Sequence, residues 1–144
     1  SGCIARGDAI VAALAMGADL AYIGSPFIAT EEANAPPAYK QMIVDSGAQD
    51  IVYTDYFSGV HGNYLMPSIV AAGIDPEVLH ARESNRMNFG SERERPKAWS
   101  QIWGAGQGIG AIREVQPAAR FIERLGVEYR KRLGEIAALA ERRH

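Results

Sequence analysis

Two short glycine turns are the residues of this sequence best suited to chemistry. Gly2-Cys3 stands at the start of the chain, and Gly24-Ser25 stands at the end of a short apolar run further along. Turns that follow neighbouring parallel strands lie at one edge of a sheet, where α/β proteins bind their ligands. A phosphate at such an edge is held by backbone N–H groups, by a glycine that lets the backbone approach, and by a hydroxyl such as that of Ser25. The spacing therefore predicts that both turns hold one phosphate.

The alternative for these turns is a purely structural role. Gly2 and Gly24, taken singly, are typical of packing glycines at strand ends, and only their spacing around an alanine-rich segment favours a shared ligand. Arg6-Gly7-Asp8 spells an adhesion tripeptide, but it stands at a loop-to-helix junction. We therefore interpret this tripeptide as structural.

A helix and a strand must position the two turns. Residues 8–16 are rich in alanine, leucine and other apolar residues, with Asp8 suited to the first turn of a helix and Gly17 to the left-handed position after it. A helix this apolar on most sides is expected to be buried by more than one neighbour. LAYIGSPF, residues 20–27, predicts a buried parallel strand. We therefore expect residues 1–35 to form a βαβ unit whose first strand is cut away, and such a unit cannot complete a barrel by itself.

The rest of the chain, residues 36–144, predicts a mostly helical, loop-rich region. Pro36-Pro37 are expected to begin a helix that ends at Gly47. Residues 50–57 favour a strand or an extended segment, and residues 58–67, with two glycines and a proline, predict a loop.

Further along, a short helix is expected over residues 68–72 and a surface excursion over residues 80–96, which are polar and aperiodic. Apolar residues recur every three or four positions from Val115 to Ala140, with Pro117 near the start of this stretch. This period predicts a long amphipathic helix at the C-terminal end.

Charge and cysteine content exclude several classes of function. The formal net charge is −2, whereas a partner such as a nucleic acid or an anionic membrane requires a basic surface. Cys3 is the single cysteine, so the chain has no intramolecular disulfide and no cysteine-rich metal site. No stretch has the length and apolarity of a membrane span, and no signal peptide is visible. We expect a cytoplasmic protein that binds no metal.

The opening segment GCIARGDAIVAALAMGADLAYIGSPFIATEEA resembles the C-terminal part of flavin-dependent barrels, among them inosine monophosphate dehydrogenases and 2-hydroxy-acid oxidases. Three later segments distinguish between these families: AYKQMIVDSGAQDIVYTDYFSGVHGNYLMPSI, MNFGS and IWGAGQGIG resemble nitronate monooxygenases, the 2-nitropropane dioxygenase family. The resemblance extends over nearly the whole chain. It implies the C-terminal portion of an FMN-dependent (β/α)8 TIM barrel, with residues 1–35 as its last βαβ unit and residues 36–144 packing on the barrel. The implied reaction is the oxidation of alkyl nitronates with O2.

The resemblance also assigns binding residues. Gly2 and Cys3 match a paired-glycine turn that holds the FMN phosphate through backbone amides, and Gly24 and Ser25 match a Gly-Thr turn that closes over the same phosphate. Cys3 departs from the pattern, which has glycine there, and is compatible with it if only its N–H is used and its φ stays negative. Gly106-Gln107-Gly108 matches a Gly-Gln-Gly loop near the flavin, so Gln107 is an expected cofactor-binding residue.

No catalytic residue is expected within this chain, because the histidine that the family uses as a base lies upstream of these strands. Of the three histidines present, only His61 stands where it could approach a substrate, and a structural role for it is the simpler interpretation. The chain is then inactive alone, and its partner is the N-terminal half of the same barrel. Two alternatives stay open: another FMN barrel, such as a flavin-type enoyl reductase, and a non-catalytic flavin- or phosphate-binding barrel remnant. A homodimer also stays open.

Overall fold

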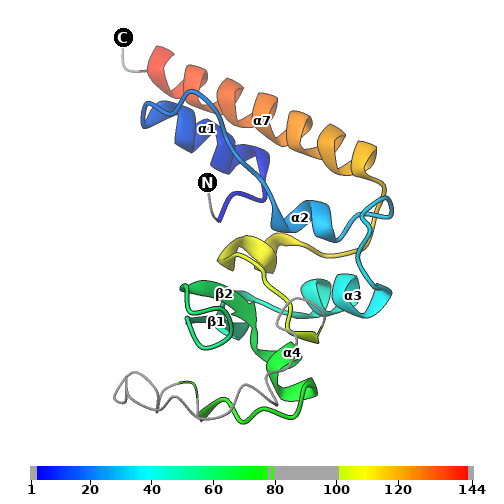
Figure 1. The fold of residues 1–144 in the computed structure, drawn as a ribbon. Coiled ribbons are helices and arrows are strands. Elements are labelled where there is room, and N and C mark those ends of the chain that lie inside the picture. Colours follow the sequence, from blue (N-terminus) through cyan, green and yellow to red (C-terminus); the bar gives the residue numbers. More distant parts are fainter. Residues whose placement is uncertain (1–2, 78, 80–100, 143–144) are drawn as a thin grey trace.

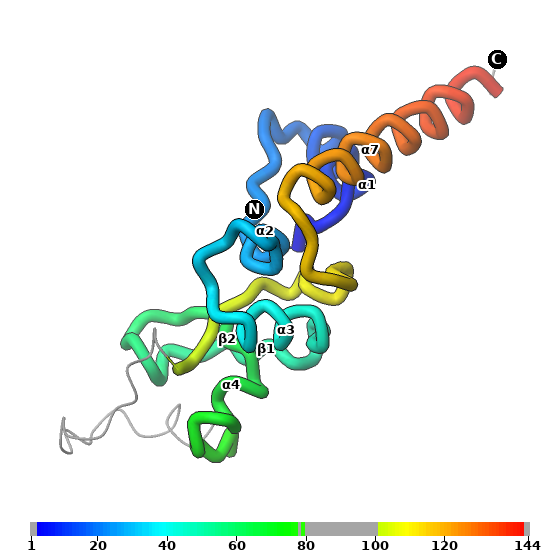
Figure 2. Tube along the Cα trace, turned by 90° about the vertical axis from the view of Figure 1, so that its right-hand side faces the viewer, coloured from blue at the N-terminus to red at the C-terminus, as the bar shows by residue number. Residues whose placement is uncertain are grey.

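The computed structural model describes residues 3–77, 79 and 101–142, which form two groups of elements. Helices α1 (Gly7–Ala15) and α7 (Ala118–Glu141) lie side by side in the first group (Figure 1). A two-stranded hairpin and several short helices make up the second group, and the short helix α2 (Ser25–Ile28) lies between the two (Figure 2). The elements of the second group are α3 (Pro37–Asp45), η1 (Ala48–Asp50), β1 (Ile51–Thr54), β2 (Gly62–Leu65), α4 (Met66–Ala71) and η3 (Gln107–Ala111).

Helix α1 forms where the sequence predicts it. Asp8 lies in its first turn and accepts a hydrogen bond from the Ala9 N–H at 2.9 Å. Gly17 follows the helix with a φ of +94°, the predicted left-handed position. The expected burial on several sides is not found, since only Gly7 and Val11 are buried and α7 is the main neighbour.

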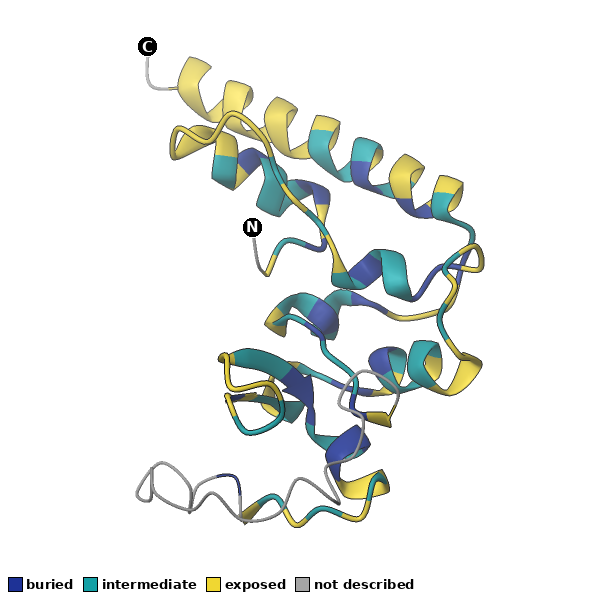
Figure 3. Cartoon of the chain, viewed as in Figure 1, coloured by how far each residue is buried: buried dark blue, intermediate teal, exposed yellow. Residues whose placement is uncertain are grey.

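Helix α7 is the predicted C-terminal helix, and Pro117 directly precedes it. The carboxylate of Glu32 accepts the first free N–H of the helix, from Ala118, at 2.9 and 3.1 Å. Phe121 and Leu125 are buried in the first half of α7, whereas the apolar side chains of the second half are exposed (Figure 3). The periodic apolar stripe thus predicts the helix correctly, but the other described residues bury only the first half of this stripe.

The predicted strand over residues 20–27 is not formed. Residues 20–24 belong to no helix or strand and pair with no strand in the described part of the chain, and α2 begins at Ser25, with Pro26 in its first turn. Leu20 is 88% exposed and Tyr22 is 74% exposed. A parallel strand is held by hydrogen bonds to neighbouring strands, so an apolar segment without such neighbours stays unpaired. The boundary at residue 35 remains a prediction.

The hairpin corrects the expected loop over residues 58–67. Strand β2 occupies residues 62–65 of that stretch and pairs antiparallel with β1, Val52 facing Tyr64. A third extended segment joins them, because the Leu65 N–H donates to the Trp103 carbonyl at 2.7 Å and the Ala105 N–H donates to the Asn63 carbonyl at 3.2 Å. The second pairing partner of β2 therefore comes from a segment far along the sequence, residues 103–105, which continues directly into Gly106.

Two small cores stabilise the second group. Ile43 of α3, Leu65 of β2 and Ile109 of η3 are fully buried in the first core, and Ile69 of α4 packs with Ile102 in the second. The expected helices over residues 37–46 and 68–72 are confirmed as α3 and α4, with slightly shifted ends. The predicted excursion over residues 80–96 lies outside the described residues. Among the helices that the structure describes, none combines the length and apolarity that crossing a bilayer requires.

Candidate phosphate site

Three segments that are distant in the sequence meet around one pocket of about 170 Å³. They are the N-terminal segment before α1, the segment that leads into α2, and the glycines at the start of η3. The pocket is lined by Cys3, Ile4, Tyr22, Gly24, Ser25, Pro26, Gly106 and Gly108. Cys3, Gly24 and Ser25, three of the predicted site residues, therefore lie together, while Gly2 lies outside the described residues.

A hydrogen bond between Ser25 and Gly106 connects two walls of the pocket. The Gly106 N–H donates to Ser25 Oγ at 2.8 Å, across 81 positions of sequence. A serine hydroxyl accepts hydrogen bonds and also donates its own proton. Ser25 can thus hold the Gly106 loop in place and still donate its proton to an anion in the pocket.

Gly24 leaves space at the pocket. A Cβ atom placed on it would meet no atom of the described residues within 4 Å, and its φ of −115° is open to any residue. Neither backbone conformation nor packing against the described residues therefore requires glycine here. A glycine that is needed only to leave room fits the close approach of a ligand to the backbone.

Cys3 and Gly108 also line the pocket and lie in close contact with each other. A Cβ atom on Gly108 would come within 2.9 Å of the Cys3 carbonyl carbon, so only glycine permits this approach. Cys3 has a φ of +53°, so the negative φ that would make cysteine compatible with the paired-glycine turn is not found. The backbone adopts the left-handed conformation of a glycine turn, and an exposed cysteine stands in it.

Gln107 does not line the pocket. Its side-chain Nε2 donates instead to Asn63 Oδ1 of β2 at 3.2 Å. The glycines on either side of Gln107, Gly106 and Gly108, form the wall instead. Their alternate spacing, Gly-x-Gly, was the signal for a backbone wall.

Size and charge limit what the pocket can hold. Pockets that enclose a whole cofactor or drug-sized molecule measure roughly 300–1,000 Å³, so this one suits a phosphate-sized group with the rest of the ligand outside it. Among the described lining residues none is a lysine or an arginine. An anion here would depend on backbone N–H groups and the Ser25 hydroxyl, the arrangement of glycine-rich phosphate sites. The described part of the chain contains no group of three acidic, histidine or cysteine side chains that could hold a metal ion.

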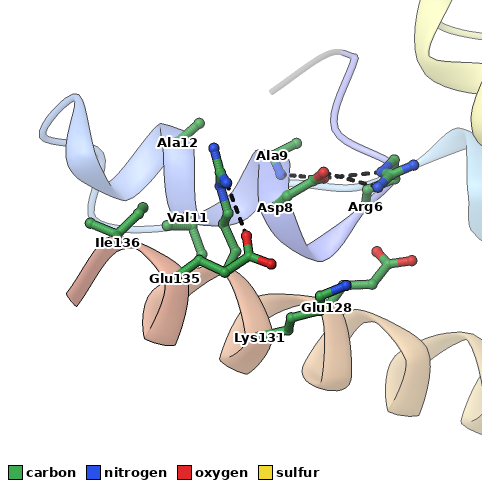
Figure 4. A pocket seen from close by; sticks show the side chains of 10 residues that line it. Arg6, Asp8, Ala9, Val11, Ala12, Glu128, Lys131, Glu135 and Ile136 are labelled. Atoms are coloured by element: carbon green, nitrogen blue, oxygen red, sulfur yellow. Dashed lines mark hydrogen bonds and ion pairs between the residues drawn. The ribbon is translucent and has the colours of Figure 1, made fainter. Parts of the chain in front are cut away.

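A larger hollow of about 520 Å³ lies between α1 and α7 (Figure 4). Three cationic and three anionic side chains line it, and several of these pair with one another: Arg6 with Asp8 at 3.0 Å and Arg132 with Glu135 at 3.0 Å. The hydrogen bond from Arg6 lowers the pKa of the Asp8 carboxyl. Paired charges of balanced sign give no preference for one kind of ligand, so this hollow belongs to the packing of the two helices.

Among the histidines, His61 lies on the surface of the hairpin. Its ring is tilted by 32° against that of Tyr53, with 4.9 Å between the centroids. His80 and His144 lie outside the described residues. No histidine of the described part lines the phosphate-sized pocket.

Comparison with known proteins decides the family. The sequence matches the nitronate monooxygenase family over residues 1–128. The chain belongs to this family. Similar relatives are nitronate monooxygenases from Paraburkholderia phytofirmans, 25% identical over 97% of this chain and 40% of that protein, and from Neurospora crassa, 24% identical over 97% of this chain and 39% of that protein. The resemblance predicted from the sequence is confirmed, and the chain spans about two fifths of the length of these relatives.

Solved structures agree with a TIM-barrel origin of this nitronate monooxygenase family member. FabK from Thermotoga maritima superimposes with a TM-score of 0.70 at 28% identity, over 96% of this chain and 45% of that one. A nitroalkane oxidase from Streptomyces ansochromogenes superimposes with a TM-score of 0.66 at 30% identity, over 94% of this chain and 40% of that one. Both are TIM-barrel enzymes, so the α/β fold class and the barrel relationship are confirmed. The order of elements within the last βαβ unit stays a prediction.

Proposed function

We propose that this chain is the C-terminal part of an FMN-dependent oxidoreductase that oxidises alkyl nitronates with O2, and that it supplies the FMN phosphate site. The observation that carries this proposal is the meeting of Cys3, Gly24 and Ser25 with Gly106 and Gly108 around one phosphate-sized pocket. FMN ends in a phosphate, and the family is one of flavin-dependent oxidoreductases.

The pocket fits a phosphomonoester. Open space beside Gly24, the hydroxyl of Ser25 and a wall made of glycine backbone are what a phosphate group needs, and the small volume leaves the flavin ring outside. Bound FMN would supply the redox chemistry of the reaction. The residues of this chain would bind the phosphate and orient the cofactor, and Gln107 would lie on the flavin side of the loop. The base and the remaining strands would come from the N-terminal half of the barrel. We expect the enzyme to work in the cytoplasm, and a homodimer remains an open alternative.

The test uses the full-length protein. After removal of any flavin it is titrated with FMN and with riboflavin, which lacks the phosphate, and the holoenzyme is then assayed for O2 uptake with an alkyl nitronate. The proposal predicts that FMN binds at least about tenfold more tightly than riboflavin, because charge-assisted hydrogen bonds to a phosphate contribute about 1.5–3 kcal/mol each. It also predicts O2 uptake that depends on both nitronate and FMN.

A second candidate is a different reaction on the same cofactor. The superposition on FabK is as close as that on nitroalkane oxidase, so the fold alone does not choose the substrate. Reduction of an enoyl thioester by NADH or NADPH, without nitronate oxidation, would favour an enoyl reductase. FMN binding without either activity would favour a non-catalytic flavin-binding protein, and equal affinity for FMN and riboflavin would contradict the phosphate site.

A further inference from the structure

One face of the β1–β2 hairpin carries three side chains of a binding type. Tyr53 and Asn63 face each other directly in the register, and His61, which precedes β2, lies with its ring against that of Tyr53. The Tyr53 and His61 rings contact each other, and Tyr53 is still 64% exposed. Large aromatic side chains that stay exposed on a sheet face are available for a flat ligand.

This hairpin face is connected to the phosphate pocket by two hydrogen bonds. Asn63 Oδ1 accepts from Gln107 Nε2 at 3.2 Å, and the neighbouring Gly106 N–H donates to Ser25 Oγ at 2.8 Å. Backbone pairing of Ala105 with Asn63 at 3.2 Å holds the same loop against β2. The hairpin face and the pocket are therefore fixed relative to each other by one short loop, residues 105–107.

We propose that the hairpin face formed by Tyr53, His61 and Asn63 is the substrate-selecting wall of the site, and that it favours small organic anions with a flat aryl substituent. A His61 ring N–H and the Asn63 side-chain N–H are donors for anionic oxygens, such as those of a nitronate or a carboxylate. The Tyr53–His61 pair offers ring surface for the substituent. The proposal rests on the proposed function, because it takes the phosphate pocket as the anchor of the cofactor.

The experiment compares an aryl-bearing nitronate with a short alkyl nitronate on the full-length, FMN-loaded enzyme. An aromatic contact contributes about 0.5–1.5 kcal/mol, so Tyr53→Ala is expected to raise KM for the aryl nitronate about threefold to tenfold. KM for the short alkyl nitronate and the affinity for FMN should stay unchanged. Tyr53→Phe keeps the ring and should restore the aryl preference.

Val60→Ala is the matched control, because Val60 is 72% exposed in the turn of the same hairpin and lies outside the three-residue face. A second readout is independent of turnover: benzoate and acetate are titrated into the oxidised holoenzyme and followed by the flavin absorbance. Tyr53→Ala should weaken benzoate about threefold to tenfold and leave acetate unchanged.

The outcomes separate the two proposals. If the unmodified protein binds no FMN, the proposed function fails, and this inference fails with it. If the unmodified holoenzyme oxidises nitronates but Tyr53→Ala changes neither the aryl KM nor benzoate binding, only the hairpin wall is wrong. A loss shared equally by aryl and alkyl substrates, or reproduced by Val60→Ala, would also overturn the selecting role.

Discussion

Gly7 of α1 lies directly against the backbone of α7 at Leu125. A Cβ atom on Gly7 would come within 2.3 Å of the Leu125 carbonyl oxygen and within 2.4 Å of the Tyr129 amide nitrogen. The Gly7 N–H also donates to Glu128 Oε2 at 2.8 Å. The glycine of the Arg-Gly-Asp tripeptide thus has a structural role, as the sequence position at a loop-to-helix junction indicates.

Gly7→Ala is therefore expected to destabilise the protein. Overpacking against backbone that cannot move aside costs about 1–3 kcal/mol, and the two helices would have to separate. Gly134→Ala is the matched control, since Gly134 lies within α7 and an added Cβ there meets no described atom within 4 Å. That change should stabilise by about 0.5–1 kcal/mol through helix propensity. Urea unfolding of the full-length variants measures both, and equal midpoints would contradict this helix contact.

Gly24→Ala and Ser25→Ala should weaken FMN binding while the fold is retained. The methyl group of Gly24→Ala enters open space at a residue that lines the pocket, without a clash or a backbone penalty, and Ser25→Ala removes a hydroxyl donor to a dianion. A hydrogen bond to a charged group contributes about 1.5–3 kcal/mol, so Ser25→Ala should lower FMN affinity roughly tenfold to hundredfold. Titration of FMN into the flavin-free variants measures this, with urea unfolding as the check on stability.

Turnover at saturating FMN distinguishes the role of Ser25. If Ser25 binds the phosphate, Ser25→Ala should leave the rate of nitronate oxidation per bound flavin nearly unchanged. The variant also loses the hydrogen bond from the Gly106 N–H, so the amide hydrogens of the glycine loop should exchange faster. Unchanged FMN affinity with lost turnover would instead assign Ser25 to the substrate.

Cys3→Gly is expected to stabilise the first turn. Cys3 has a φ of +53°, and a non-glycine residue in the left-handed region costs about 1–2 kcal/mol, partly offset by the greater freedom of glycine in the unfolded chain. A gain of up to about 1 kcal/mol in the free energy of unfolding should follow. Cys3→Val, which is β-branched, should lower it instead. A loss of stability in Cys3→Gly would show that the turn does not need this conformation.

Tyr39 is expected to make stability depend on alkaline pH. Its hydroxyl donates to the Gly104 carbonyl, its ring stacks on Trp103 at 4.9 Å, and burial raises the pKa of Tyr39 above its ordinary value of 10.0. The folded state thus favours the neutral phenol. This contribution is fully present below pH about 10 and is lost as pH rises through the raised folded pKa, since the unfolded chain ionises first.

Tyr39→Phe should remove this alkaline loss and also cost about 0.5–1.5 kcal/mol at neutral pH for the missing hydrogen bond. The free energy of unfolding, measured by urea at several pH values from neutral to alkaline, tests both. Tyr53→Phe, at an exposed tyrosine, is the control and should leave the pH dependence as it is. An equal alkaline loss in Tyr39→Phe and in the unmodified protein would assign it to other groups.

The sequence by itself determined those features whose signals are local. The helix after Asp8 with Gly17 at its end, the helix begun by Pro36-Pro37 and the periodic C-terminal helix follow from propensity, caps and spacing, and all three form. The family resemblance was also visible in short motifs, because turns that hold a phosphate need glycines at set positions.

Only the tertiary structure decided the features that depend on distant partners. Residues 62–65 became a strand because they pair with β1 and with residues 103–105, whereas residues 20–24 stayed unpaired for lack of a neighbouring strand. The wall of Gly106 and Gly108, the bond from Gly106 to Ser25 and the turn of Gln107 toward Asn63 are contacts across long sequence separations. No periodicity or local propensity in the sequence predicts such contacts, because strand pairing and pocket walls depend on which segments the folded chain brings together.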